Sequence, residues 1–137
     1  KYQEHRVNWW DAVDVISSSG YYPYGDWENQ LDRIETVVNR FQKPFFFAET
    51  GCMSVKGSKE VPNDWCVRGD ADPKGQAEWY EDMFNACSKR DWVGGMTLWS
   101  WDAKLYQERS AKTRMDYEIY AMPAEKVVKK YYDIFNK

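Results

Sequence analysis

The sequence has 137 residues, of which 43% are hydrophobic and 30% charged, with a net charge of −3 and an isoelectric point near 5.2. This is the composition of one ordinary globular domain, and it excludes an intrinsically disordered chain. The acidic balance argues against nucleic acid or an anionic lipid surface as the partner, and no apolar run reaches the roughly 18–20 residues of a membrane-spanning helix.

Aromatic residues are unusually frequent: eight Trp, ten Tyr and six Phe make up 18% of the chain. A Trp-rich core accounts for part of this number. The rest is consistent with a surface that stacks sugar rings, because sugars present C–H faces to aromatic planes and Trp and Tyr add a polar edge for hydrogen bonding. The composition therefore favours an oligo- or polysaccharide as the ligand.

Cysteine and histidine are too few for a metal site or a disulfide framework. The three cysteines, Cys52, Cys66 and Cys87, form no CxxC pair, and His5 is the only histidine. An odd number of thiols leaves at least one unpaired within the chain, and we expect all three to be reduced. Without a Cys/His cluster we expect no metal site, and the chemistry inferred below requires no cofactor.

The first half of the chain combines helical patterns with one strand-like run. Residues 1–11 resemble the end of a helix, and Val13–Ser19 is a β-branched run that predicts a buried strand. After a loop rich in Gly, Pro and Tyr, Asp26 is placed to cap the next helix. The apolar residues of that helix fall on one stripe, at Leu31, Ile34, Val38 and Phe41.

The second half repeats this order. Phe45–Glu49 is a continuous apolar run that ends in an acid, and such a run is typical of a parallel strand buried on both faces. A long loop follows over Thr50–Asp72, a length that usually indicates a functional loop. Asp72-Pro73 predicts the start of a helix, Gly94–Asp102 a third strand, and Met122-Pro123 the start of a last helix.

This alternation predicts an α/β fold with parallel strands. Three strands alone leave two exposed sheet edges, so we expect the remaining strands to come from upstream sequence or from a second chain. The sequence begins at Lys1 without an initiator Met or a signal-peptide pattern. We therefore expect the C-terminal part of a longer protein.

Aromatic residues and one acid follow the three predicted strands. Tyr21 and Tyr22 come after the first strand, Glu49 closes the second, and Trp99 and Trp101 lie at the end of the third. Functional groups of βα proteins gather at the carboxyl ends of parallel strands, so these residues are expected to share one rim. The pattern indicates a sugar-binding rim that contains a carboxylate, although such an acid can also cap a helix or pair with an arginine.

These motifs resemble the last three βα units of clan-A glycoside hydrolases, which are retaining glycosidases on a (β/α)₈ TIM barrel. The resemblance rests on a Lys-Pro and apolar run before Glu-x-Gly, with Gly-x-x-x-Trp-x-Trp about 45 residues later. Within the clan, the stretches GYYPY, KPFFFAETG and GGMTLWSWD are most similar to the family-113 β-mannanases. The resemblance implies that residues 1–137 are the C-terminal portion of a barrel catalytic domain, a partial barrel in this chain.

The resemblance also implies an activity and a set of site residues. The activity is retaining hydrolysis of β-linked glycosides, with a β-mannan-type substrate favoured. Carried onto this chain, the family's nucleophile is Glu49, its aromatic platform under the sugar is Trp99, and its orienting tyrosine is Tyr22, with Tyr21 a close rival. Further substrate contacts are expected from Tyr21, Trp101 and Trp65.

The resemblance supplies only half of a catalytic pair. A retaining glycosidase needs a second carboxyl group ~5–5.5 Å from the first. In the family that acid/base glutamate follows an Asn at the end of strand four, and this sequence contains no Asn-Glu dipeptide. The alternative is a catalytically incomplete fragment that binds sugar or is structural. Pairing of two identical copies ranks lower, because three strands from each do not sum to eight.

Overall fold

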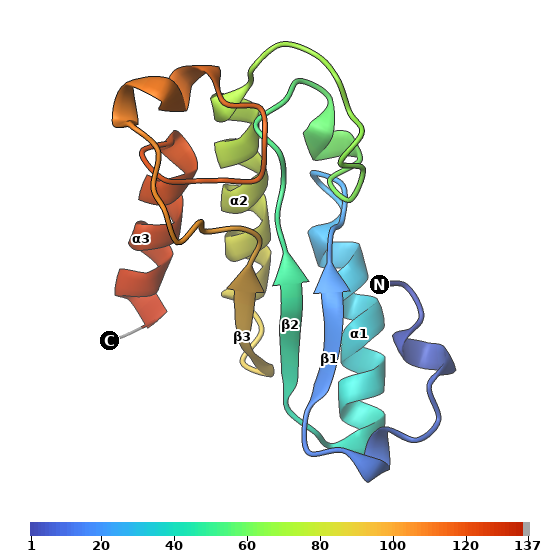
Figure 1. Ribbon diagram of the computed structural model, residues 1–137. Helices are drawn as coiled ribbons and strands as arrows, with labels where there is room; N and C mark the ends of the chain where they lie inside the picture. Colours follow the sequence, from blue (N-terminus) through green and yellow to red (C-terminus); the bar gives the residue numbers. More distant parts are fainter. Residues whose placement is uncertain (136–137) are drawn as a thin grey trace.

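The computed structural model describes residues 1–135 and has three parallel strands, each followed by a helix (Figure 1). The sheet has the order β1-β2-β3. Its strands are β1 (Ile16–Gly20), β2 (Phe45–Thr50) and β3 (Val93–Leu98), and its helices are α1 (Trp27–Phe41), α2 (Pro73–Cys87) and α3 (Pro123–Phe135). The predicted α/β fold with parallel strands is therefore confirmed.

The two predicted helix caps behave differently. Asp72 accepts a hydrogen bond from the backbone N–H of Gly75 at 2.9 Å, directly before Pro73 opens α2. Asp26 precedes α1 as expected, but its carboxylate accepts hydrogen bonds from the side chains of Asn29 and Gln30 instead of from the backbone. Both acids therefore mark the helix starts, and only Asp72 caps its helix through the backbone.

The apolar stripe of α1 and two residues of β2, Phe45 and Phe47, form the centre of the core. Phe45 and Phe47 are fully buried, whereas Phe46 is half-buried and Ala48 exposed. The prediction that this strand is buried on both faces is therefore wrong for the described chain. The cause is that the helices cover only one face of the sheet, and alternate side chains of a strand point to opposite faces.

Edge-to-face aromatic pairs fill the space between the sheet and the helices. The ring of Trp27 lies 4.9 Å from that of Tyr22, 5.5 Å from that of Phe47 and 5.5 Å from that of Trp79. These distances and near-perpendicular planes are the favoured geometry for aromatic pairs. A substantial share of the aromatic residues is therefore core.

Several predicted element boundaries differ from the structure, and β1 begins at Ile16 instead of at Val13. Residues 1–11 do not contain the end of an α-helix; they form a 3₁₀ turn at Glu4–Arg6 and enter a second one at Trp10–Ala12. The third strand ends at Leu98 and not at Asp102. The consequence is that Trp99 and Trp101 lie in irregular backbone beyond the strand.

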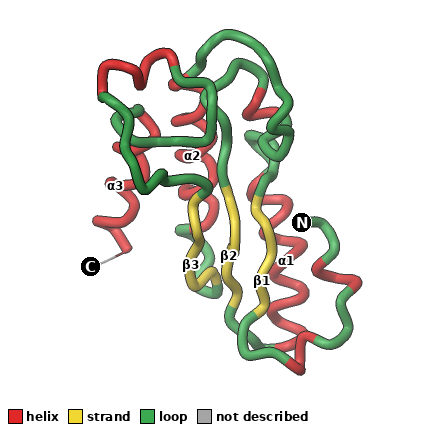
Figure 2. The backbone as a smooth tube through the Cα atoms, in the orientation of Figure 1, coloured by secondary structure: helices red, strands yellow, loops and turns green. Residues whose placement is uncertain are grey.

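The long loops gather at the end of the sheet where the three strands finish (Figure 2). One of them connects β2 to α2 and another connects β3 to α3. None of the helices in residues 1–135 is both long and apolar enough to cross a membrane. Cys52, Cys66 and Cys87 are all free thiols.

Candidate active site

Glu49 lies at the carboxyl end of the central strand and lines a cleft. It is the penultimate residue of β2, half-buried, and is paired in register with Ser19 of β1. The cleft has a volume of about 420 Å³, and its lining residues are Tyr21, Glu49, Asn63, Trp65, Trp99 and Tyr117. Five of these six residues are aromatic or acidic, which fits the predicted sugar-binding rim with a carboxylate.

Tyr21 is the hydrogen-bond donor to Glu49. Its hydroxyl donates to Oε1 of the carboxylate, and the residue is 7% exposed. Burial, together with this hydrogen bond to Glu49, raises the pKa of Tyr21 well above its usual range. The phenol therefore remains a donor throughout neutral and mildly alkaline pH, where it holds and aims the carboxylate.

The preference for Tyr22 over Tyr21 as the orienting tyrosine is wrong on this geometry. Tyr22 is fully buried on the helix side, where its ring packs against Trp27 and Tyr2 and its carbonyl oxygen accepts from the indole N–H of Trp79 at 2.8 Å. Neighbouring residues point to opposite sides, so only one of the two tyrosines reaches the acid. The resemblance favoured Tyr22, whereas the hydrogen bond to Glu49 comes from Tyr21.

The three predicted tryptophans divide between two places. Trp99 and Trp65 line the cleft with exposed fractions of 52% and 73%. Trp101 does not line it and instead packs edge-on against Tyr120, with ring centres 5.8 Å apart. Its expected contact with substrate assumed a strand that continues to Asp102, and β3 ends at Leu98. Beyond the strand, residues two apart need not share a face.

Two cleft residues were not identified from the sequence. Asn63 comes from the long loop after β2, and Tyr117 from the loop after β3. The Tyr117 hydroxyl donates to the carbonyl oxygen of Pro62 at 2.8 Å, its ring meets that of Tyr21 edge-on at 6.3 Å, and burial raises its pKa to about 12. Neither residue lies in a periodic segment, so the sequence contained no local signal for either.

The charges in the cleft define what it can do chemically. Glu49 is the only carboxylate among the described lining residues, and none of those residues is basic. Within residues 1–135 no group of three or more His, Cys, Asp or Glu side chains is arranged to hold a metal ion. One oriented carboxylate among aromatic rings is suited to act as a nucleophile or as a ligand for sugar hydroxyls.

Comparisons with known proteins agree with this geometry. The family model described as Glycoside Hydrolase Family 113 matches residues 1–122. Two structures, titled as a GH113 β-1,4-mannanase and as a complex of one, share 52% and 51% identity with this chain, each with a TM-score of 0.93. The GH113 β-mannanase AaManA from Alicyclobacillus acidocaldarius, in complex with ManMIm, shares 40% identity with a TM-score of 0.91. No protein with a curated description matches the chain.

Each of these three matches covers 97% of this chain but only 43% of the other, so the chain spans less than half the length of those enzymes. Its three parallel βα units are accordingly a part of a TIM barrel. A family-model match over nearly the whole chain, together with identities of 40–52%, shows that the chain belongs to glycoside hydrolase family 113.

Proposed function

We propose that residues 1–137 are the C-terminal portion of a retaining β-mannan-type glycoside hydrolase and supply the nucleophile half of its active site. The observation that carries this proposal is the Tyr21–Glu49 hydrogen bond in a cleft lined by Trp99 and Trp65. A nucleophilic carboxylate must be ionised and aimed, and a neutral phenol that donates to it does both. Two of the similar structures are β-1,4-mannanases, which supports β-mannan as the substrate.

In the proposed reaction, an oxygen of Glu49 attacks the anomeric carbon and the bond from that carbon to the leaving oxygen breaks. The leaving oxygen takes a proton from an acid outside this chain. Water then breaks the glycosyl–Glu49 ester, and the same outside group accepts the water's proton. Two inversions give net retention of configuration. The exposed ring of Trp99 is placed to stack against the sugar ring during both steps.

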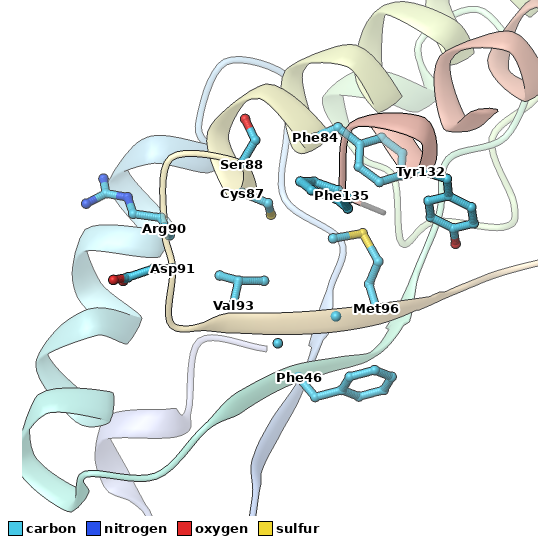
Figure 3. A pocket seen from close by; sticks show the side chains of 12 residues that line it. Phe46, Phe84, Cys87, Ser88, Arg90, Asp91, Val93, Met96, Tyr132 and Phe135 are labelled. Atoms are coloured by element: carbon cyan, nitrogen blue, oxygen red, sulfur yellow. The ribbon is translucent and has the colours of Figure 1, made fainter. Parts of the chain in front are cut away.

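The remainder of the barrel is proposed to come from the part of the protein beyond these three βα units. A cavity of about 660 Å³ opens between the free edge of β3 and helices α2 and α3. The apolar side chains of Phe84, Met96, Tyr132 and Phe135 lie around it (Figure 3). An open strand edge flanked by an apolar cavity is the seam expected where a barrel continues with another βα unit. The match covers only 43% of the chain of each of these relatives, so their remaining residues are available to form the other βα units.

The stereochemistry of hydrolysis tests this proposal directly. The complete protein should cleave β-1,4-mannooligosaccharides, and proton NMR during the first minutes should show the β-anomer of the new reducing end before mutarotation. An α-anomeric first product would contradict the nucleophile role, because inversion requires no covalent intermediate. Complete absence of cleavage across β-mannosides and β-glucosides would contradict the hydrolase proposal itself.

Replacement of Tyr21 by Phe should lower kcat of the complete protein about 10²-fold, the order of effect seen when one donor to a reacting oxygen is removed. Because the pKa of Tyr21 is raised far above neutrality, its ionisation does not set the alkaline limb of activity. The variant should therefore have a lower rate at every pH with the alkaline limb in the same place. Steady-state kinetics from pH 4 to pH 9 measure this.

Tyr22→Phe is the matched control for that variant. The Tyr22 hydroxyl is buried and has no hydrogen-bond partner among the described residues, so its loss should leave kcat within about twofold. Equal losses in the two variants would mean that the hydrogen bond to Glu49 does not orient the nucleophile.

A second candidate function applies to this chain by itself. Since Glu49 is the only carboxylate among the described lining residues, the chain without its barrel partner is proposed to bind sugar without cleaving it. Titration with mannohexaose should then change the Trp fluorescence to saturation with no product. In the same titration, the Trp99→Ala variant should show only a small part of this fluorescence change. Product formation by the chain alone would exclude this candidate.

A further inference from the structure

One buried acid, Glu118, lies beside the candidate active site without lining the cleft. Glu118 is only 2% exposed. Its Oε1 accepts a hydrogen bond from the Ser100 hydroxyl at 3.0 Å. Its Oε2 has no hydrogen-bond partner among the described residues. Burial, reinforced by the charge of Asp102, raises the pKa of this carboxyl. A buried carboxyl with one unsatisfied oxygen costs free energy of folding, which calls for an explanation.

The partner of Glu118 is attached directly to the aromatic platform. Ser100 follows Trp99 in the chain, and its backbone N–H donates to the carbonyl oxygen of Tyr117 at 3.4 Å. The N–H of Trp99 donates to the carbonyl oxygen of Thr50 at 2.7 Å, and a Cβ on Gly51 would come within 2.2 Å of the Trp99 carbonyl oxygen. The platform backbone is therefore held on one side by the end of β2 and on the other by residues 117–118.

The segment that carries Glu118 is itself anchored to the elements around Glu49. The N–H of Ser54 donates to the carbonyl oxygen of Asp116 at 2.9 Å. The buried side chain of Gln76, on α2, donates through Nε2 to the carbonyl oxygens of Cys52 and Glu118 at 2.9 and 3.2 Å. The loop after β2 and helix α2 thus both hold residues 116–118 in place. Glu118 is therefore a rigidly positioned hydrogen-bond acceptor for Ser100.

We propose that Glu118 is a positioning residue that acts through Ser100 to fix Trp99 as the sugar platform beside Glu49. This inference rests on the proposed function. Glu118 is not among the residues that line the cleft around Glu49, and only its role as hydrogen-bond acceptor for Ser100 is required. Its negative charge is not required, since a neutral amide oxygen can accept the same bond. Platform placement acts on substrate binding, and a misplacement of about 1 Å can cost on the order of 10² in rate.

Kinetics of the complete protein on mannohexaose test the inference with four variants. Glu118→Leu should raise KM about 10-fold with a smaller fall in kcat, and Ser100→Ala should do the same. Glu118→Gln retains the acceptor and should recover most of what Glu118→Leu loses. Glu108→Leu, the same change at an exposed acid of the same loop, is the matched control and should not alter KM. Because Ser100 is only half-buried, Ser100→Ala keeps the test valid if Glu118→Leu fails to fold.

The Trp99→Ala background separates positioning from other roles. If Glu118 acts through Trp99, adding Ser100→Ala or Glu118→Leu to Trp99→Ala should change kcat/KM by less than twofold. A full additional loss in that background would overturn the inference, as would a Glu118→Gln variant as impaired as Glu118→Leu. A wild-type protein that cleaves no β-mannoside would instead contradict the proposed function, so the two failures are distinguishable.

Discussion

Replacement of Glu49 by Gln should lower kcat of the complete protein by about 10⁴-fold or more, comparable to the cost of removing a catalytic nucleophile in other hydrolases. The amide keeps the shape of the side chain and can still accept the hydrogen bond from Tyr21, but it cannot attack the anomeric carbon. Substrate affinity should change little, because the aromatic lining of the cleft is untouched. Single-turnover kinetics on an activated aryl β-mannoside and a separate binding titration measure the two effects.

Chemical rescue distinguishes a lost nucleophile from a damaged cleft. Glu49→Ala should regain activity on an activated aryl β-mannoside when azide is added, because the azide ion attacks the anomeric carbon from the vacated side and expels the phenolate. The product should be the α-mannosyl azide. Glu60→Gln, an exposed acid of the loop after β2, is the matched control and should keep wild-type activity. A Glu49→Gln enzyme with more than a tenth of wild-type kcat would contradict the assignment.

Replacement of Phe47 by Ala should lower the free energy of unfolding by about 3–5 kcal/mol, the usual cost of truncating a fully buried aromatic residue. The Phe47 ring lies 4.8 Å from that of Phe45 and 5.5 Å from that of Trp27. A Cβ added at Gly20 would come within 2.7 Å of it, so the site is packed without spare space. Phe47 is two residues from Glu49 on β2, and activity should be lost at lower denaturant concentrations in step with unfolding.

Phe41→Ala is the matched control for that stability prediction. The residue lies at the end of α1 and is half-buried, so truncation should cost less than half as much. Chemical denaturation of the complete protein, followed by Trp fluorescence, measures both variants. Equal shifts in midpoint would mean that Phe47 is not at the centre of a tightly packed core.

The order of elements could be predicted because it depends on local patterns. The β-branched run before Gly20, the apolar run Phe45–Phe47 and the stripes of α1 and α3 each indicate one element, and parallel strands follow from their alternation. The end of β3 could not be predicted, because Trp99–Trp101 has the residue types of a strand. The exposed face of β2 was also not predicted. A continuous apolar run shows which residues are apolar, but it does not show whether other elements cover one or both faces of the strand.

The candidate site was predictable where it follows the strands and not where it depends on loops. Glu49, Trp99 and Tyr21 lie at strand ends, where parallel strands bring them to one rim. The choice between Tyr21 and Tyr22 depends on which of two neighbouring side chains faces the cleft beyond the end of β1, and no residue pattern reveals this. Loop residues are positioned by long-range hydrogen bonds and not by any period.

Gln76 is a second example of a residue whose position depends on contacts that are distant in sequence. It is a polar residue one turn into α2, yet it is fully buried. Its side chain amide donates to carbonyl oxygens of Cys52 and Glu118, which are distant in sequence. Residues of this kind connect the segments that follow β2 and β3, and a single sequence contains no signal for such connections.

The central claim is that Glu49 forms the covalent bond to the sugar, and mass mapping of a trapped intermediate tests it most directly. The complete protein would be treated with a 2-deoxy-2-fluoro-β-mannoside that carries a good leaving group, then digested and sequenced by tandem mass spectrometry. The account predicts one fluoromannosyl group on Glu49 in the peptide that contains Phe45–Thr50, and none in Glu49→Gln. A stable adduct on any other residue would contradict it.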